Sequence, residues 1–330
     1  MKTQAVLFPK TDSFEMTDIT LDEPGVNDIV VRTLVSSISP GTERWILRGR
    51  HMGTQFPLIP GYHRIGVVES AGKDVSAFKT GDVVYGCGNR WKEKTINSMW
   101  GAHVGMSVSA PAGYNLLSHS MLSPAELESL SFSVVIGVAV RGIRFLDPKF
   151  RQSMVIIGGG IIGVCAAMLA QKRGCAVAVL EPDTERRAFI QKLLPLVLDP
   201  ADTSLEEKLK AIAPNGFDHL YDSVGHAPTT DRLVKLMRSQ GTVLLQAQYF
   251  DKEKCAIDID QIKLKELTIK TTCGTRDEDW HDTTTYIRDG YLPVTPLITQ
   301  RFGTEDILTG YELLSSGKPF NLGMVFNWNN

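Results

Sequence analysis

The spacing of hydrophobic and polar positions divides the chain into two kinds of segment. In about the first 120 residues, short β-branched runs such as VVRTLVSSIS, RIGVVESAG and GDVVYG are interrupted by glycine, proline and aspartate. Runs of this kind predict short strands that are joined by tight turns. At residues 123–126, SPAE supplies an N-cap serine, a proline in the first turn and an acidic residue, which together predict a helix start.

Beyond this point, short apolar runs alternate with longer stretches of helical spacing. We predict strands at MVIIG, CAVAVLE, FDHLYDSV, TVLLQAQ and ELTIKTTCG, and helices at IIGVCAAMLAQKRG, DTERRAFIQKLL and TTDRLVKLMRSQG. This alternation is typical of a doubly wound parallel sheet with helices on both faces. The sequence therefore predicts an α/β fold in which residues 123–274 form an α/β domain. That domain is inserted into a β-rich domain built from residues 1–122 and 275–330.

The amino-acid composition limits the classes of molecule that the protein could bind. The 330 residues suffice for two domains that each bury a core, and 43% hydrophobic with 22% charged residues is ordinary for a soluble protein. The net charge of −2 and the absence of basic runs argue against nucleic acid or a membrane surface as partner. We therefore expect a small molecule as the substrate.

Cysteine usage and the apolar segments bear on the compartment. The five cysteines are scattered and include no C-x-x-C pair, which argues against a disulfide framework or a cysteine zinc site and predicts a cytoplasmic protein. The apolar run before Pro9 is too short for a signal peptide. The uncharged stretch 154–170 contains four glycines where a strand should turn into a helix, so we expect no membrane span there.

A glycine-rich turn provides the clearest functional motif. Gly158, Gly160 and Gly163 form G-x-G-x-x-G between a predicted strand and a predicted helix, which is typical of a dinucleotide-binding turn. Peptide N–H groups at the start of that helix would face the pyrophosphate. We also expect cofactor contacts from this first helical turn and from the ends of two later strands: Ile161, Ile162, Ser223, Val224, Ala247 and Gln248.

The next strand ends in an acidic residue, Glu181, 18 residues after Gly163. A carboxylate at this place accepts hydrogen bonds from ribose hydroxyls and repels the extra phosphate of NADP, so we predict NAD as the cofactor. Arg186, one turn into the following helix, weakens this prediction because an arginine there could reach a phosphate. The alternative is that the glycines only make a tight turn and that Glu181 is a solvated loop acid.

The chain as a whole resembles the medium-chain dehydrogenase/reductase superfamily. The similarity runs from PLIPGYHRIGVVESAG and GDVVYG through VIIGGGIIG and LEPDTERR to PLITQRF and GYELLSSG, and it covers nearly the whole chain. The resemblance implies a Rossmann cofactor domain and a GroES-like catalytic domain. It also implies hydride transfer between a substrate and a nicotinamide cofactor.

The zinc-bearing branch of this superfamily carries I-C-G-S-D in one loop and G-H-E-x-x-G about twenty residues later. The matching stretches here are SPGTE and GYHRIG, so Pro40 replaces the metal cysteine, Tyr62 the metal histidine and His63 the metal-side glutamate. The third ligand should fall near Val134, and the four-cysteine structural lobe is missing. The resemblance therefore implies a zinc-free member. The S-x-G-T-E run favours a branch that resembles the dehydrogenase of the hydroxyethyl group of bacteriochlorophyllide.

Without a metal, side chains must polarise the substrate oxygen. Thr42 retains the hydroxyl that relays a proton in the family, and Tyr62 places a phenol where the metal ligand would be. His63 and Ser39 are further catalytic candidates, and His51 lies just downstream of the same loop. Each of them could instead have only a structural role, as a turn residue or a half-buried side chain.

These residues leave three functions open. The first is NAD-linked interconversion of a secondary alcohol and a ketone, the second is NAD(P)H-linked reduction of an activated C=C bond, and the third is a non-catalytic NAD-binding sensor. The family also implies a homodimer, in which the edge strand at 266–272 pairs with its mate. Several residues could line a mouth for a flat or anionic substrate, although an ordinary surface or core role is favoured for them: Trp45, Trp91, Trp100, Lys92 and Lys94.

Overall fold

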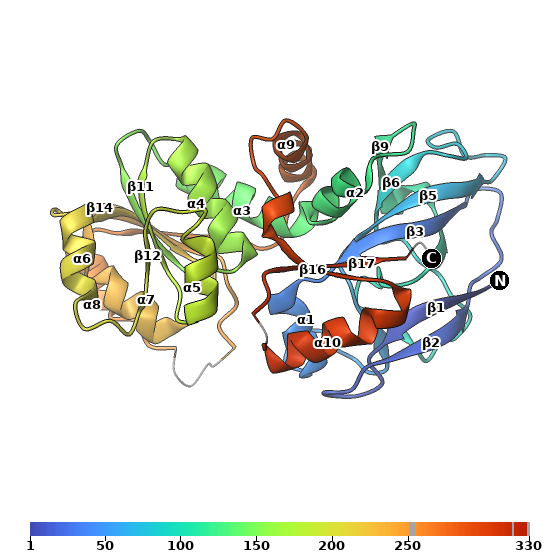
Figure 1. Cartoon of the computed structure of the whole chain (residues 1–330), viewed down its shortest axis with the longest axis horizontal. Coiled ribbons are helices and arrows are strands. Elements are labelled where there is room, and N and C mark those ends of the chain that lie inside the picture. The colour runs from blue at the N-terminus through green and yellow to red at the C-terminus, as the bar shows by residue number, and fades with distance from the viewer. Residues whose placement is uncertain (251–254, 319, 329–330) are drawn as a thin grey trace. The chain divides into compact units, whose positions relative to one another are not determined.

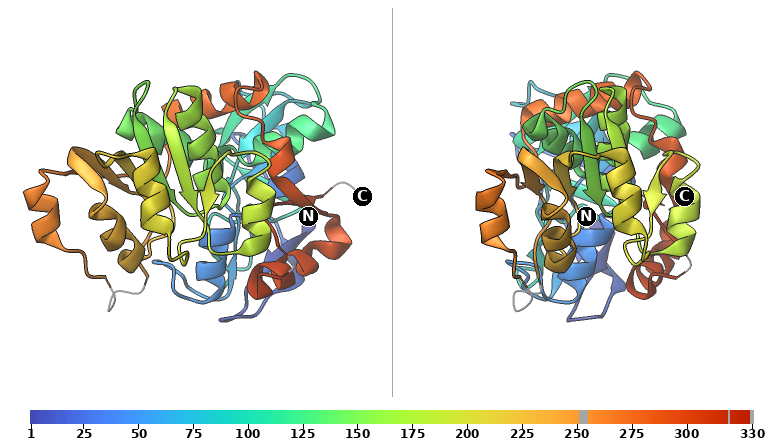
Figure 2. Two further views of the ribbon diagram at one scale, coloured as in Figure 1. Left: turned by 60° about the vertical axis from the view of Figure 1, so that its left-hand side comes forward. Right: turned by 90° about the vertical axis from the view of Figure 1, so that its left-hand side faces the viewer.

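The structure of the chain, a computed structural model, describes residues 1–250, 255–318 and 320–328. It divides into two compact units. We call Met1–Val134 together with Pro293–Asn330 the terminal unit, and Val135–Leu292 the central unit. The blue N-terminal and red C-terminal segments belong to the same unit (Figures 1 and 2).

The boundaries between the units differ from those expected at residues 123 and 275. Helix α2 (Pro124–Ser131) belongs to the terminal unit, because it packs on strands β3 (Ile29–Ser37) and β5 (Arg64–Ala71). Helix α9 (Asp277–Arg288) belongs to the central unit, where Asp279 forms an ion pair of 2.9 Å with Arg144. Tertiary contacts of these two helices, which local patterning does not reveal, set the boundaries.

The terminal unit is built around a seven-stranded sheet. The strand order is β16-β17-β3-β5-β6-β9, and β8 pairs with the first four residues of β3. Two small sheets, β1-β2 and β4-β7, complete the unit. Its remaining elements are β1 (Lys2–Leu7), β2 (Glu15–Thr20), α1 (Pro40–Leu47), β4 (Leu58–Ile59), β6 (Val83–Gly86), β7 (Asn97–Ser98), β8 (Met106–Ser109), η1 (Pro111–Gly113), β9 (Tyr114–Ser118), η3 (Thr295–Leu297), β16 (Ile298–Phe302), η4 (Thr304–Asp306), α10 (Ile307–Ser316) and β17 (Gly323–Asn327).

The central unit contains a six-stranded sheet in which every neighbouring pair is parallel. Its order, β12-β11-β10-β13-β14-β15, is the doubly wound Rossmann order 3-2-1-4-5-6. Figure 1 shows the helices of this unit packed around the sheet. Its elements are α3 (Ser133–Leu146), β10 (Ser153–Ile157), α4 (Ile161–Lys172), β11 (Ala176–Leu180), α5 (Thr184–Ile190), β12 (Val197–Leu198), α6 (Leu205–Ile212), β13 (Phe217–Asp222), α7 (Ala227–Val234), β14 (Met237–Leu245), α8 (Ile259–Leu264), β15 (Thr268–Thr271) and α9.

One predicted element is partly wrong. The pattern TTDRLVKLMRSQG predicts a single helix up to residue 241, but α7 ends at Val234 and β14 already begins at Met237. Met237 is buried in the core of the unit and is paired with Phe217 of β13. Tertiary pairing therefore converts the last turn of the expected helix into strand.

Among the helices that the structure describes, no single one is both long enough and apolar enough to cross a bilayer. Only the bent pair α2 and α3, taken together, has sufficient length and apolar composition.

Candidate active site and nucleotide site

The glycine-rich turn connects β10 to α4 at the carboxyl edge of the parallel sheet. Gly158 has a φ of +101°, which a side chain would strain, and a Cβ on Gly163 would lie 1.9 Å from the carbonyl oxygen of Gly158. A Cβ on Gly160 would meet nothing within 4 Å. The turn therefore has no space for a side chain at Gly163, where helix and strand pack. It leaves space at Gly160, at the helix N-terminus, where a pyrophosphate would bind.

The predicted phosphate contacts begin immediately after this opening. Ile161 and Ile162 are the first residues of α4, whose first backbone hydrogen bond runs from Val164 N–H to the Gly160 carbonyl. The peptide N–H groups of a first helical turn have no partner within the helix and are oriented along its dipole. This geometry fits the phosphates of a dinucleotide.

Glu181 follows β11 and is 3% exposed. Its Oε2 accepts a hydrogen bond of 3.0 Å from Gly159 N–H, and its Oε1 accepts one of 2.9 Å from Asp183 N–H. Arg186 donates to Glu181 Oε2 at 3.5 Å. The carboxylate is therefore fixed against the glycine-rich turn, and Arg186 lies beside it.

The other predicted cofactor residues gather at the same edge of the sheet. Ser223 donates to the Ile157 carbonyl at 2.6 Å, and a Cβ on Gly158 would meet both Ser223 and Val224. Ala247 N–H donates to the Asp222 carbonyl at 3.2 Å, which brings the end of β14 to this loop. Gln248 lies against Gly225, since a Cβ there would meet the Gln248 carbonyl oxygen at 2.3 Å.

Asp222 is a residue of this edge that the sequence patterns did not reveal. It is fully buried, and its Oδ1 accepts hydrogen bonds from the peptide N–H groups of Val224 and Gly225 at 2.8 and 2.9 Å. Thr230 and Tyr249 donate to Oδ2 at 2.7 and 2.5 Å. Asp222 therefore fixes the loop that carries Ser223 and Val224. Its only sequence signal is an acidic residue at the end of an apolar strand.

In the terminal unit, the structure brings Thr42 and Tyr62 together. Thr42 lies in the first turn of α1, and its Oγ1 is 2.8 Å from the Tyr62 hydroxyl. Tyr62 follows Gly61, whose φ of +101° turns the chain before β5. The ring of Trp100 packs edge-on against the Tyr62 ring, with centroids 4.4 Å apart. Two hydroxyl groups are thus within proton-transfer distance of each other.

A buried polar network lies under α1. Glu43 is 1% exposed and accepts hydrogen bonds from Ser39 N–H at 2.8 Å and from the Tyr311 hydroxyl at 2.7 Å. Its Oε2 also lies 3.2 Å from His103 Nε2. A Cβ on Gly61 would meet the His103 ring at 2.6 Å, so His103 also supports the turn before Tyr62. Glu43 and His103 therefore fix both segments that carry the hydroxyl pair.

His63 and Tyr62 pack against different aromatic rings. Its ring packs edge-on against Tyr85, with centroids 4.8 Å apart, and its buried Nδ1 has no hydrogen-bond partner among the described residues. The Tyr85 hydroxyl accepts a hydrogen bond of 2.8 Å from Val134 N–H. Burial lowers the pKa of His63 to about 4, with a smaller contribution from the charge of Arg64, so the ring is neutral at pH 7.

The two remaining candidates are Ser39 and His51. Ser39 is the N-cap residue of α1, but its side chain makes no capping hydrogen bond. His51 Nδ1 lies 2.9 Å from the Met52 carbonyl, and its ring is 5.9 Å from that of Trp100. Whether Ser39, His51, His63, Thr42 or Tyr62 takes part in catalysis stays a prediction.

The donor set does not fit a zinc ion. At the family's ligand positions, Pro40 and Val134 have no side-chain donor, and the Tyr62 hydroxyl is engaged with Thr42. Within the part of the chain that the structure describes, no three His, Cys, Asp or Glu residues lie close enough together to hold a metal ion.

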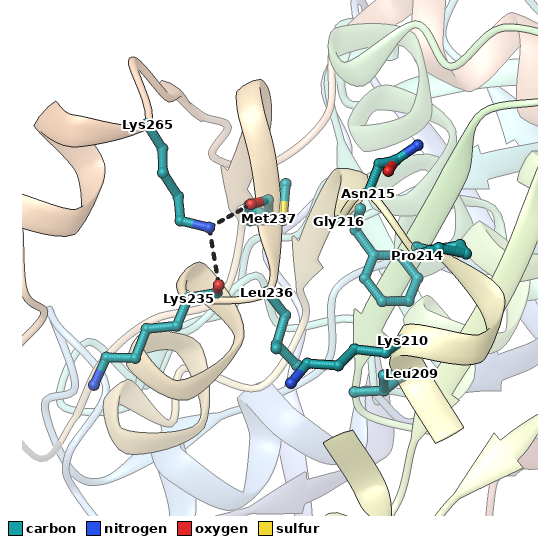
Figure 3. A pocket seen from close by; sticks show the side chains of 11 residues that line it. Leu209, Lys210, Pro214, Asn215, Gly216, Lys235, Leu236, Met237 and Lys265 are labelled. Carbon is teal, nitrogen blue, oxygen red and sulfur yellow. Dashed lines mark hydrogen bonds between the residues drawn. The ribbon is translucent and has the colours of Figure 1, made fainter. Parts of the chain in front are cut away.

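One pocket of about 230 Å³ lies elsewhere in the central unit, at the amino ends of β13 and β14 (Figure 3). Lys265 Nζ donates at this pocket to the Lys235 and Met237 carbonyl oxygens at 2.9 and 2.6 Å. The lysine thus satisfies carbonyl groups after the end of α7. The pocket is at the sheet edge opposite to the glycine-rich turn, so it is not the nucleotide site.

Comparison with known proteins agrees with this architecture. Residues 25–126 match the family described as alcohol dehydrogenase GroES-like domain, and residues 162–288 match the family described as zinc-binding dehydrogenase. These matches fall in the terminal and the central unit respectively. The chain belongs to the medium-chain dehydrogenase/reductase superfamily, and it is an oxidoreductase of the dehydrogenase type.

Two curated relatives match over nearly the full length. The 2-desacetyl-2-hydroxyethyl bacteriochlorophyllide A dehydrogenase of Cereibacter sphaeroides is 27% identical and covers 99% of each chain. The L-threonine 3-dehydrogenase of Deinococcus deserti is 26% identical and covers 95% of each chain. Among solved structures, a zinc-binding dehydrogenase from Sinorhizobium meliloti, bound to NADP, has a TM-score of 0.81 at 19% identity. That match covers 99% of this chain and 100% of the other.

Proposed function

We propose that this protein is an NAD-dependent, zinc-independent dehydrogenase that interconverts a secondary alcohol and a ketone. The observation that carries this proposal is the hydrogen bond of 2.8 Å between Thr42 and Tyr62 at positions where the superfamily places its zinc site. A hydroxyl pair can accept and relay the proton of an alcohol, which a metal would otherwise help to release. The two relatives described above, a hydroxyethyl bacteriochlorophyllide dehydrogenase and an L-threonine 3-dehydrogenase, support a hydroxyl-bearing substrate.

The central unit supplies the cofactor site in this proposal. The first turn of α4 binds the pyrophosphate through its peptide N–H groups, and Glu181 binds the ribose hydroxyls. A nicotinamide cofactor held by these residues would supply the hydride acceptor for oxidation of the carbinol carbon and, in its reduced form, the hydride donor for the ketone. The buried carboxylate of Glu181 disfavours the additional phosphate of NADP, since two negative charges would meet there.

The terminal unit supplies the proton acceptor. Alcohol oxidation removes a hydride from carbon and a proton from oxygen, so a base must lie within about 3 Å of that oxygen. In its phenolate form Tyr62 takes the proton and becomes a phenol. The phenol then releases a proton through Thr42 toward solvent and returns to phenolate, because the two oxygens are already in hydrogen-bonding contact. His63 is a weaker base in this arrangement, since a pKa of about 4 gives little driving force at pH 7.

The test is a pair of substrate panels. Purified protein with NAD+ should form NADH from at least one class of secondary alcohol, followed by nicotinamide absorbance. The same protein with NADH or NADPH should not reduce activated enones at a comparable kcat/KM. Reduction of enones without any alcohol oxidation would replace this proposal with a C=C reductase. NAD binding without turnover on either panel would indicate a sensor.

A further inference from the structure

The strand that follows Tyr62 begins with a completely buried arginine. Arg64 is the first residue of β5 and is 0% exposed. Its Nε donates to the Tyr114 hydroxyl at 2.9 Å and one terminal nitrogen donates to the Gly101 carbonyl at 3.1 Å. The other terminal nitrogen donates to the Gly88 carbonyl. Its guanidinium carbon also lies 5.6 Å from the centroid of the Tyr114 ring.

All these acceptors are neutral. Within residues 1–250, 255–318 and 320–328, Arg64 makes no ion pair with a carboxylate, although buried charges in proteins are usually paired. Arginine does not lose its proton in proteins. The interior of the terminal unit therefore holds a positive charge that is hydrogen-bonded but not neutralised by a counter-ion.

Two features connect this charge to the proposed proton acceptor. Arg64 is two residues after Tyr62, and its hydrogen-bond acceptor Gly101 directly follows Trp100, whose ring packs on Tyr62. Trp100 has a φ of +65°, which is strained for an aromatic residue, and Asn89 Nδ2 holds its carbonyl at 2.8 Å. The guanidinium thus also fixes the backbone that carries the aromatic neighbour of Tyr62.

The positive charge of Arg64 acts on two neighbouring ionisable groups. Its positive charge contributes to the lowered pKa of His63, and it opposes the burial that raises the pKa of Cys87. Both effects have the sign expected of a positive charge, which favours deprotonated side chains. The same field therefore favours a negative charge on a phenol in the same region.

The other ionisable groups around Tyr62 do not provide this charge. On the α1 side, Glu43 is held by Ser39, Tyr311 and His103, and it would oppose a phenolate rather than stabilise one. Of the neighbouring histidines, His103 lies against Glu43, His63 is neutral at pH 7, and the ring of His51 lies 5.9 Å from that of Trp100. Thr42 and Cys87 bear no positive charge, so Arg64 is the permanent cation of this set.

We propose that Arg64 is a positioning residue whose buried, unpaired charge stabilises the phenolate form of Tyr62, the form that accepts the proton of the alcohol. This inference rests on the proposed function, because it takes Tyr62 as the proton acceptor. It gives the guanidinium the electrostatic part of the role that zinc has in other members of the superfamily.

The test compares titrations of Tyr62 in the full-length protein without substrate. The phenolate absorbance of the wild type minus that of Tyr62→Phe reports the pKa of Tyr62 alone. We expect it to lie below the ordinary value of about 10. Arg64→Met should raise it by about one unit or more, and Arg64→Lys, which keeps the charge, should stay near the wild-type value. The pH profile of kcat for alcohol oxidation should shift upward by the same amount in Arg64→Met.

Arg32→Gln is the matched control. It removes an arginine charge from the neighbouring strand β3, where Arg32 is ion-paired with Glu69 on the surface, so the pKa of Tyr62 should not change. Circular dichroism establishes that each variant is folded.

Two results would overturn the inference. One is a Tyr62 pKa of about 10 or above in the wild type, which decides the question even if no Arg64 variant folds. The other is an equal shift in Arg64→Met and Arg64→Lys, which would indicate loss of packing rather than loss of charge. Because the titration needs no substrate, its outcome is independent of whether Tyr62→Phe loses turnover, which tests the proposed function separately.

Discussion

Tyr62 and Thr42 carry the chemistry at the scale of single residues. We predict that Tyr62→Phe lowers kcat by about 10²-fold or more, because the ring still packs on Trp100 but the proton acceptor is lost. NAD affinity should be almost unchanged, since the nucleotide residues are in the central unit. Thr42→Val should lower kcat in the same way, to a smaller degree. Steady-state kinetics and cofactor titration measure the two effects.

Histidine variants provide the comparison for this prediction. His63→Ala and His51→Ala should keep most of the wild-type kcat, because the ring contacts described for them are with Tyr85 and Trp100. Near-normal turnover of Tyr62→Phe together with an inactive His63→Ala or His51→Ala would show that the proton moves through histidine.

Cofactor choice depends on one carboxylate. NAD(H) should bind at least tenfold more tightly than NADP(H), because the extra phosphate would meet Glu181, which is 3% exposed and fixed by Gly159 N–H. Fluorescence titration of both cofactors provides the measurement. Glu181→Gln should reduce the preference for NAD(H) over NADP(H). Equal affinities in the wild type would indicate that Arg186 compensates for the phosphate charge.

At this scale the resemblance to the superfamily singled out Thr42 and Tyr62 as catalytic candidates, and the structure brings their hydroxyl groups into contact. Their part in catalysis stays a prediction. The network of Glu43, His103 and Tyr311 could not be predicted, because hydrogen bonds join residues as many as 268 positions apart. No local pattern carries that information, and an isolated buried histidine resembles any core residue in sequence.

At the scale of elements, two glycines of the glycine-rich turn have different roles, one in packing and one in cofactor binding. Gly163→Ala should destabilise the protein by roughly 1–3 kcal/mol, because its Cβ would lie 1.9 Å from the Gly158 carbonyl oxygen. Gly160→Ala should leave stability nearly unchanged, since its Cβ meets nothing within 4 Å, but it should weaken NAD binding where the pyrophosphate approaches. Thermal denaturation and cofactor titration distinguish the two variants. Equal stability of both would contradict the packing argument.

Elements with a complete local signal were predicted well. The SPAE sequence starts α2 as expected. It also forms a capping box, with Ser123 accepting from Glu126 N–H and Glu126 accepting from Ser123 N–H. The strand after α7 was misassigned in its first residues, because Met237–Gly241 has helical spacing but pairs with β13. Local preference decides an element only where tertiary contacts agree with it.

At the scale of the whole molecule, the order of strands and helices predicted the doubly wound sheet. The alternation of the elements leaves few topologies, since parallel crossovers are right-handed and short. The unit boundaries at Val134 and Pro293 could not be obtained in this way, because α2 and α9 are assigned by what they pack against.

We propose that the protein forms a homodimer or a dimer of dimers. Among the described residues, strand β15 is the last strand of its sheet, and its Ile269 is 40% exposed, so this apolar edge is available to a second copy. Light scattering at micromolar concentration should give at least twice the mass of the 36.4 kDa chain. Ile269→Lys should shift the population toward monomer. A wild-type monomer at that concentration would refute the proposal.

The central claim is that side chains rather than zinc assist the proton transfer, and turnover by metal-free protein tests it most directly. Protein dialysed against a strong chelator should contain no stoichiometric zinc by elemental analysis and should keep its full kcat with NAD+ and the secondary alcohol. This is expected because Pro40, Tyr62 and Val134 do not form a zinc-ligand set. About one zinc per chain, with activity lost on its removal and restored by its return, would contradict the account.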